Sequence, residues 1–233
     1  MKTCVLIPAR MGSSRLPNKP LALINGQPMI VRVYQQACAA DVGPVYVACD
    51  GPEVLLVIKC IGGHAIITDP DLPSGSDRIW AALQQIDQDF DVIVNLQGDL
   101  PTISPQLIQA VLKPLENPDI DIATLGFRHD DDARAQNPND VCIALSASGE
   151  ALYFSREALP YGETSYIHHI GIYAYRRQAL EKFVSLPPSP LEKRERLEQL
   201  RALEAGMRIG VALVDEEPVG VDTMEDLQKV RNA

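Results

Sequence analysis

The sequence lacks a long run of apolar residues. The longest dense apolar stretch, residues 54–61, is interrupted by Lys59 and is far shorter than the roughly 20 residues with which a helix crosses a bilayer. A signal-peptide pattern is also missing, because Lys2 is followed only by the short run CVLIP and then by Arg10. We therefore expect a soluble, cytoplasmic protein that does not associate with membranes.

Cysteine pairs at metal-binding or redox spacing are absent as well. The five cysteines form no CxxC motif, and their odd number leaves one unpaired in any disulfide scheme. Scattered thiols of this kind are typical of a reducing compartment. Cys4, Cys49 and Cys60 stand in apolar patterns, which predicts small core residues rather than nucleophiles.

Acidic residues are missing from residues 1–40, although the whole chain has a net charge of −10. That acidic balance argues against a protein that binds nucleic acids. Residues 1–40 contain five Lys or Arg, so the other 193 residues carry 16 cations against all 31 acids. A cationic segment on an acidic protein indicates an anion site, such as one for phosphates. A chance cluster of solvated side chains explains the charge equally well.

The first half of the chain alternates between strands and helices. Apolar runs predict strands at 3–8, 45–50, 64–68 and 91–96. Helices are expected at 28–40, from 52 to the Gly62-Gly63 pair, at 77–86 and, capped by Ser104, at 104–115. This alternation predicts an α/β fold of the Rossmann-like type, a mostly parallel sheet with helices on both faces. Ligands of such sheets bind at the carboxyl ends of the strands.

The alternation of strands and helices stops near residue 119. Four strands without intervening helices are expected at 121–128, 141–146, 151–156 and 166–175, as an antiparallel addition. A charged helix ending at Gly206, a strand at 207–216 and a last helix at 222–232 follow. We interpret residues 1–233 as one domain, with a nucleotide-binding half (about 1–118) and a sugar-binding and dimerisation half (about 119–233).

The loop after the first strand lacks the GxGxxG of a dinucleotide fold, and no Walker GxxxxGK[ST] occurs in the chain. These absences weigh against a dehydrogenase and a P-loop kinase. The loop instead offers Arg10, Arg15 and Lys19, whose charges can neutralise a triphosphate. Small residues at 12–14 let backbone N–H groups approach phosphate oxygens. The loop is therefore a candidate phosphate site.

The same loop, IPARMGSSRLPNKPL, resembles the signature of the sugar-nucleotide cytidylyltransferases, and specifically of the 3-deoxy-manno-octulosonate cytidylyltransferase (CMP-Kdo synthetase) family. Further matching segments follow in order along nearly the whole chain: PSGSDRI, VNLQGDLP, ALYFSR, HHIGIYAYRR, PLEKRERLEQLRALEAGMRI and GVDTMEDL. The resemblance implies that CTP and 3-deoxy-D-manno-octulosonate (Kdo) are joined into CMP-Kdo, with release of pyrophosphate, for lipopolysaccharide biosynthesis. It also implies Mg²⁺ as cofactor and a homodimer.

The resemblance further implies a role for each matching residue. Asp99 and Asp222 are the implied Mg²⁺ ligands, and the implied catalytic residues are Arg10, Arg15, Lys19 and Asp99. The implied nucleotide-binding residues are Ala9, Arg10, Ser14, Lys19, Ser74, Gly75, Arg78 and Gln97. The implied sugar-binding residues are Arg156, His169, Tyr173, Glu198 and Gln199.

Several of these residues also have a purely structural interpretation. Asp99 suits a turn before Leu-Pro. Asp222 with Glu225 fits an N-cap with a capping box, and Ser76 or Asp77 fits the start of a helix. His168-His169 suits an ordinary strand, and the charged helix that carries Glu198 and Gln199 predicts a solvated face. In each case both roles remain open.

The chain departs from the family pattern at four positions. Asn18 stands where many relatives have Gly, and Leu100 where many have an acidic residue. Pro73 stands where relatives often have His, and Cys142 replaces a Lys. The departures leave the reaction class intact but loosen the choice of sugar. Three alternatives stay open: a cytidylyltransferase for sialic acid or 8-amino-Kdo, a glycosyltransferase with a metal-binding motif at 130–132, and a silent paralogue, which Cys142 in place of Lys would suit.

Overall fold

The computed structural model describes residues 1–12, 15–130, 140–159 and 165–232. Within it, the chain forms two compact units, one of residues 1–109 and 218–233 and the other of residues 110–217. The boundary between the units differs from the expected division at residue 118. The end of the chain returns to the first unit instead of staying with the sugar-binding half.

The first unit is built on four parallel strands. They are β1 (Thr3–Ala9), β4 (Val45–Cys49), β5 (His64–Ile67) and β6 (Val92–Leu96), in the spatial order β6-β1-β4-β5. Each pairing is parallel, so all four carboxyl ends reach the same edge. β1 and β6 are almost entirely buried apolar residues, as expected for strands covered on both faces.

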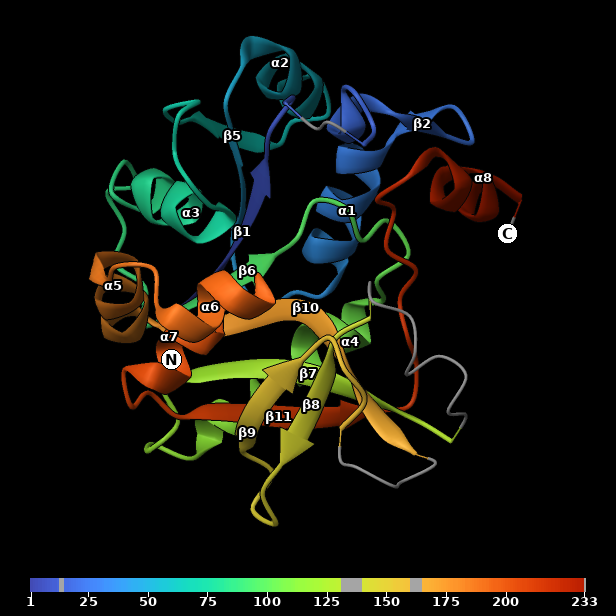
Figure 1. The fold of residues 1–233 in the computed structure, drawn as a ribbon. Helices are drawn as coiled ribbons and strands as arrows, with labels where there is room; N and C mark the ends of the chain where they lie inside the picture. Colours follow the sequence, from blue (N-terminus) through green and yellow to red (C-terminus); the bar gives the residue numbers. More distant parts are fainter. Residues whose placement is uncertain (13–14, 131–139, 160–164, 233) are drawn as a thin grey trace. The chain divides into compact units, whose positions relative to one another are not determined.

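Helices α1 (Met29–Ala39), α2 (Pro52–Cys60) and α3 (Gly75–Leu83) connect these strands. Figure 1 shows α1 and α3 on opposite sides of β1, against which both pack. The predicted mostly parallel sheet with helices on both faces is therefore confirmed. Cys4 and Cys49 are buried as expected, but the expectation for Cys60 is wrong: it lies at the end of α2 and is exposed, because Val54 and Ile58 form the buried face of that helix.

The single helix expected at 104–115 is divided in two. It consists of α4 (Pro105–Ala110) and the 3-10 helix η2 (Lys113–Glu116). Pro114 explains the break, because proline lacks an N–H and its ring clashes with the preceding helical turn. Ser104 accepts a hydrogen bond from the Leu107 N–H, so its predicted capping role is confirmed.

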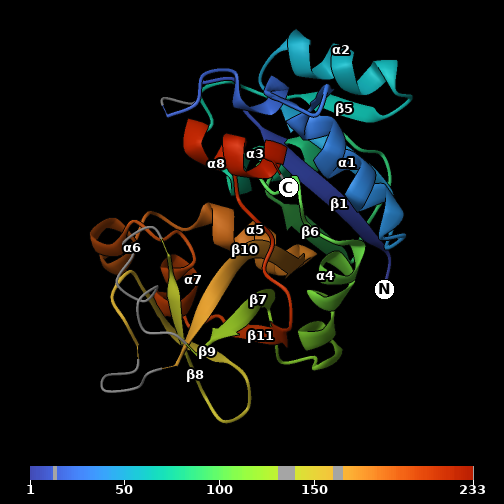
Figure 2. The same cartoon turned by 90° about the vertical axis from the view of Figure 1, so that its right-hand side faces the viewer.

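The end of the chain packs on the loop that follows β1. This region holds η1 (Lys19–Leu21), the small hairpin of β2 (Leu23–Ile24) and β3 (Gln27–Pro28), and α8 (Met224–Asn232). Figure 1 shows α8 beside β2, and in the turned view of Figure 2 α8 again lies next to blue segments from the beginning of the chain. Their apolar side chains form one buried cluster of Leu16, Ile24, Met29, Val221, Leu227 and Val230. Burial of this cluster anchors the last helix to the first unit.

The second unit is built on five strands. They are β7 (Ile122–His129), β8 (Cys142–Leu145), β9 (Ala151–Ser155), β10 (Tyr166–Arg176) and β11 (Ile209–Val214). The predicted antiparallel pairing is confirmed for β7 with β10, β10 with β8 and β8 with β9. β11 instead runs parallel to β7. It can do so because three helices and their loops separate it from β10 and let the chain cross back.

The helices of the second unit also differ from the expectation. α5 (Arg177–Ser185) was not predicted, and the one charged helix is really two, α6 (Pro190–Glu195) and α7 (Leu200–Glu204). Arg196 ends α6 with a left-handed backbone, at φ 58°. Ser189 and Glu192 form a capping box at the start of α6. Among the described residues, no helix is both long and apolar enough to cross a membrane.

Candidate functional site

The carboxyl ends of β1 and β6 border a pocket of about 370 Å³ in the first unit. It is lined by residues from the loop after β1, the start of α3, the loop after β6 and the segment before α8. Those lining residues are Pro8, Ala9, Arg10, Arg15, Lys19, Pro20, Leu72, Pro73, Ser74, Gly75, Arg78, Gln97, Gly98, Asp99 and Asp222. The structure therefore brings together every described member of the expected nucleotide, catalytic and metal sets; Ser14 lies outside the described residues.

Lys19 bridges the two expected metal ligands. Its Nζ lies 2.7 Å from Asp99 Oδ2 and 2.7 Å from Asp222 Oδ1. Burial alone would lower the pKa of the Lys19 ammonium, but the charges and hydrogen bonds of the two carboxylates together raise it above its ordinary value. Lys19 therefore stays charged and holds together two carboxylates that would otherwise repel each other.

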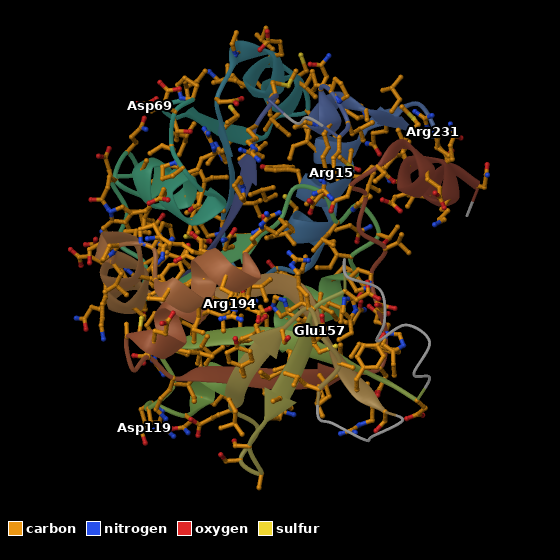
Figure 3. All side chains as sticks on the ribbon, viewed as in Figure 1. Arg15, Asp69, Asp119, Glu157, Arg194 and Arg231 are labelled. Atoms are coloured by element: carbon orange, nitrogen blue, oxygen red, sulfur yellow. The ribbon has the colours of Figure 1, made fainter. Side chains whose placement is uncertain are left out.

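Arginines complete the charge balance of this pocket. Arg15, labelled in Figure 3, places a guanidinium nitrogen 3.2 Å from Asp222 Oδ2, with 60% of its side chain exposed. An ion pair this exposed contributes little to stability and can be exchanged at low cost for another anion. Arg10 is exposed and makes no ion pair with any described residue. Two arginines of the pocket are thus available to an anionic ligand.

The loop after β6 and the segment before α8 are fixed to each other. Val221 N–H donates to the Asp99 carbonyl at 2.9 Å, and Val219 N–H donates to Thr102 Oγ1 at 2.7 Å. Gly98 lies so close to β1 that an added Cβ would be 3.0 Å from the Pro8 carbonyl oxygen. This close packing determines where the Asp99 and Asp222 carboxylates are presented.

The structure corrects the expected cap of the last helix. Thr223 Oγ1 accepts from the Asp226 N–H, and Asp226 accepts in return from the backbone N–H groups of Asp222 and Thr223. The capping pair is therefore Thr223 with Asp226, not Asp222 with Glu225. Because Thr223 performs the cap, the Asp222 carboxylate is free of that role and points to Lys19 and Arg15.

The start of α3 is also capped by a different residue than expected. Ser74 caps it by accepting from the Asp77 N–H at 3.1 Å, so the expectation of Ser76 or Asp77 as cap is wrong. Ser74 begins the helix earlier because its hydroxyl also donates to the Asp77 carboxylate. Gly75, the next residue, packs closely against Pro8, because an added Cβ would be 3.3 Å from the Pro8 side chain. The N-terminal N–H groups of α3 thus adjoin the pocket, which favours an anion there.

Arg78 and Gln97 have structural partners inside the pocket wall. The buried Arg78 guanidinium donates to Thr68 Oγ1 at 2.7 Å and to two backbone carbonyls of the following turn. Gln97 Nε2 donates to Asn95 Oδ1 at 3.1 Å. These bonds hold the loop after β5 and the end of β6; nucleotide contacts by the two residues stay predictions.

Asp50 is a site residue that sequence reasoning missed. It follows β4, and both of its carboxylate oxygens lie 3.1 Å from the Met11 N–H. It therefore fixes the start of the loop that carries the cations. The signal was present in the sequence, since Asp50 ends a buried strand at the same sheet edge as Asp99.

In the second unit, His169 is buried and held by Thr124. His169 Nε2 lies 3.0 Å from the Thr124 hydroxyl, which itself donates to the Ile172 carbonyl at 2.8 Å. Since the hydroxyl hydrogen is used there, His169 donates from Nε2. Burial, with His168 nearby, lowers the pKa of His169 to about 3. His169 is thus a neutral imidazole, and Thr124, which sequence reasoning missed, fixes its tautomer.

Tyr173 and Glu198 join His169. The rings of Tyr173 and His169 are 5.3 Å apart, despite an irregular register between Ile170 and Tyr173. Burial, followed by the neighbouring Tyr175 and the negative charge of Glu198, raises the pKa of Tyr173 well above its ordinary value. The phenol therefore keeps its proton, and three of the five expected sugar-binding residues form one group.

The two other expected sugar-binding residues are Gln199 and Arg156. Gln199 is only 7% exposed, which corrects the expected solvated face, and its Nε2 has no hydrogen-bond partner among the described residues. A buried amide without a partner is costly, which suits a residue that awaits a polar ligand. Arg156 instead donates from Nε to the Glu195 carbonyl at 3.1 Å, so Glu195, which the sequence did not single out, positions it.

The four residues that depart from the family pattern lie in different environments. Asn18 has φ 56°, a left-handed conformation that Asn tolerates almost as Gly does. Pro73 lines the pocket, and Leu100 is buried. Cys142 is buried, and burial raises the pKa of its thiol, so no charge replaces the expected Lys. Most of the alternative motif at 130–132 lies outside the described residues.

Comparison with known proteins gives consistent results. The sequence matches the cytidylyltransferase family over residues 4–209. It is 56% identical to a 3-deoxy-manno-octulosonate cytidylyltransferase of Azorhizobium caulinodans, over 97% of this chain and 93% of the relative. It is 52% identical to one of Paramagnetospirillum magneticum, over 97% and 95%. A solved CMP:2-keto-3-deoxy-manno-octonic acid synthetase complexed with CTP is 40% identical over 100% of this chain and 98% of that chain, with a TM-score of 0.94.

Proposed function

Because the chain belongs to the 3-deoxy-manno-octulosonate cytidylyltransferase family, we propose that its first unit binds CTP in the pocket around Lys19. The enzyme transfers the cytidylyl group of CTP to Kdo, giving CMP-Kdo and pyrophosphate. The product serves lipopolysaccharide biosynthesis. The observation that carries the proposal is the arrangement of Lys19 between Asp99 and Asp222, in a pocket that Arg15 and Arg10 also line.

The pocket exchanges ion pairs when the nucleotide binds. Arg10, Arg15 and the N–H groups that begin α3 face the entering triphosphate. Lys19 can transfer its hydrogen bonds from the two carboxylates to phosphate oxygens. The carboxylates released in this way would repel the phosphates unless a divalent cation bridged them.

Asp99 and Asp222 fit Mg²⁺ as that cation. They offer oxygen donors, which Mg²⁺ prefers, and the Lys19 ammonium already occupies the position of a cation between them. When bound, Mg²⁺ neutralises phosphate charge and favours displacement of pyrophosphate. Asp99 and Asp222 would hold it, and Lys19 and Arg15 would stabilise charge that develops on phosphoryl oxygens.

The acidic sugar binds through groups of the second unit. Neutral His169 and protonated Tyr173 suit the hydroxyl groups of Kdo, and Gln199 supplies an amide that lacks a partner. Arg156 suits the carboxylate, which a guanidinium can hold with two parallel hydrogen bonds. The anomeric hydroxyl then attacks the α-phosphorus in line, without a covalent enzyme intermediate, so positioning and electrostatics provide the catalysis. The chain acts as a homodimer in the cytoplasm.

Pyrophosphate release tests the proposal. CTP and Mg²⁺ are supplied with Kdo, its 8-amino analogue or sialic acid as acceptor, and release is expected with Kdo. Release with another acid alone would keep the reaction and change the substrate. No release with any acid, from folded protein that binds CTP, would favour a glycosyltransferase or a silent paralogue, since neither produces pyrophosphate.

A further inference from the structure

A cluster of three potential metal ligands lies in the second unit, and the proposed reaction does not use it. It consists of His129, His168 and Glu217, whose ligand atoms all lie within 4.8 Å of one another. We propose that this cluster binds one divalent transition-metal ion of the Zn²⁺ type through His129 Nε2, His168 Nδ1 and a Glu217 carboxylate oxygen.

Strand pairing brings the two histidines together. His129 ends β7, where it pairs with Tyr166 of the antiparallel strand β10, and His168 follows two residues further along β10. Residues two apart on a strand share a face, so the two imidazoles are diagonal neighbours on one side of the sheet. Their ring centroids are 5.9 Å apart.

The third ligand comes from the other neighbour of β7. β11 runs parallel to β7 up to Val214, and the chain then continues to Glu217. Glu217 Oε1 lies 2.5 Å from His168 Nδ1 and 3.4 Å from His129 Nε2. The three side chains are 11%, 19% and 21% exposed for His129, His168 and Glu217, so the cluster is mostly shielded from water but open to an entering ion.

The ring of His129 is held before any ion binds. It stacks on Tyr166 at 5.0 Å with an 18° angle between the planes, and meets the edge of Phe127 at 4.7 Å. Tetrahedral zinc, with bonds of roughly 2.0 to 2.1 Å, places its ligand atoms roughly 3.4 Å from one another. The 3.4 Å distance from His129 Nε2 to Glu217 Oε1 already meets this value. Rotation of the Glu217 side chain can lengthen the 2.5 Å distance from Glu217 Oε1 to His168 Nδ1.

The ligand types select the metal. Two imidazole nitrogens and one carboxylate oxygen suit Zn²⁺, Ni²⁺ or Co²⁺, and leave a fourth position for water. Mg²⁺ prefers oxygen ligands, and Asp99 and Asp222 supply carboxylate oxygens in the pocket of the first unit. The two sites are therefore expected to differ in metal preference, and one can be titrated without filling the other.

The test is a titration of metal-free, untagged full-length protein with Zn²⁺ against a chromophoric chelator. Cys38 and Cys60 are exposed thiols that also bind zinc, so both are first changed to Ser. We expect one equivalent of Zn²⁺ to bind in an excess of Mg²⁺. His129→Gln, His168→Gln and Glu217→Gln should each weaken binding about tenfold or more. The matched control is His64→Gln, an exposed histidine of the first unit, which should leave the affinity unchanged.

Spectroscopy separates ligation from a purely structural role. Co²⁺ in place of Zn²⁺ should give visible absorption bands of four-coordinate cobalt, and these should be lost in Glu217→Gln while circular dichroism shows the fold retained. A substoichiometric uptake of Zn²⁺ by the folded Cys-to-Ser protein would overturn the proposal. So would equal affinity in the parent and all three variants, because His129, His168 and Glu217 would then form only a hydrogen-bonded cluster.

Discussion

The pocket of the first unit and the proposed sugar-binding residues His169 and Tyr173 of the second unit differ in charge. The pocket of the first unit collects charges, and Lys19 and Arg15 balance Asp99 and Asp222 through ion pairs that are partly exposed. His169 and Tyr173 in the second unit are titratable but neutral, because burial lowers the pKa of His169 to about 3 and raises that of Tyr173.

The difference matches what each unit is proposed to bind. A triphosphate with its cation requires charges that can change partners, and partly exposed ion pairs do so at low cost. A sugar offers hydroxyl groups, which neutral donors and acceptors recognise without bringing a buried charge. Changes to the first unit should therefore alter the response to Mg²⁺, and changes to the second unit the response to pH.

The largest effect is expected for Asp99→Asn. Turnover should fall by about 10³ or more, because an amide replaces a carboxylate that is proposed to hold Mg²⁺. Stability should change by less than about 1 kcal/mol, since the side chain is 34% exposed. Pyrophosphate release over a range of Mg²⁺ concentrations, with urea unfolding, measures both, and the exposed Asp87→Asn is the control. A fully active, Mg²⁺-responsive variant would remove Asp99 from the metal site.

Lys19→Met should lower kcat/KM by about 10², because Lys19 is proposed to turn from the carboxylates to the phosphates. It should also increase the affinity for Mg²⁺ in the absence of nucleotide, since no ammonium then neutralises Asp99 and Asp222. Calorimetric titration with Mg²⁺ checks this, with the exposed Lys59→Met as control. Unchanged Mg²⁺ affinity would show that the bridging ammonium does not compete with the cation.

These expectations rest on residues that sequence reasoning could find, but not all of the site was accessible in that way. Motifs pointed to the cations, both aspartates and the proposed sugar-binding residues, because each lies in a matching segment. Asp50 and Thr124 act through contacts with residues 39 and 45 positions away, and only the sheet register creates those contacts.

The fold, too, was predictable where local sequence patterns determine it and was missed where contacts between distant residues determine it. The apolar runs of β1, β4 and β6 predicted a parallel sheet, because strands buried on both faces read as continuous apolar runs. β5 was predicted from a similar run, although its residues are exposed or half-buried. The break between α6 and α7 was missed because Arg196, which carries no turn signal in its side chain, adopts a left-handed backbone. The parallel pairing of β11 was missed because it depends on how the chain returns, which local patterns do not encode.

Gly98→Ala tests the rigid edge that presents Asp99. The added methyl group would lie 3.0 Å from the Pro8 carbonyl oxygen, so we expect a destabilisation of about 1 to 3 kcal/mol. Gly171→Ala in the second unit, where a Cβ meets nothing within 4 Å, is the matched control. Denaturant midpoints compare the two. Equal stability of both variants would mean that β1 shifts freely against the loop after β6.

His169→Asn should make the free energy of unfolding depend less on pH between about pH 3 and 6.5. An unfolded histidine takes up a proton near pH 6.5, whereas folded His169 does so only near pH 3. Between these values the unfolded state binds one more proton, so wild-type stability falls as the pH falls, by up to about 1.4 kcal/mol per pH unit. Urea unfolding between about pH 4 and 6.5 measures the slope. If His169→Asn kept the wild-type slope while His64→Asn lost it, the protonation would belong to His64 and not to His169.

The return of residues 218–232 to the first unit has a consequence for synthesis. Asp222 and the apolar residues of α8 are made after the whole second unit, yet they complete a pocket and a buried cluster begun by Leu16 and Lys19. While the second unit emerges from the ribosome, the apolar side chains of the first unit that α8 later covers are therefore exposed. A chain stopped before residue 218 would carry every cation of the pocket and only one of its two carboxylates.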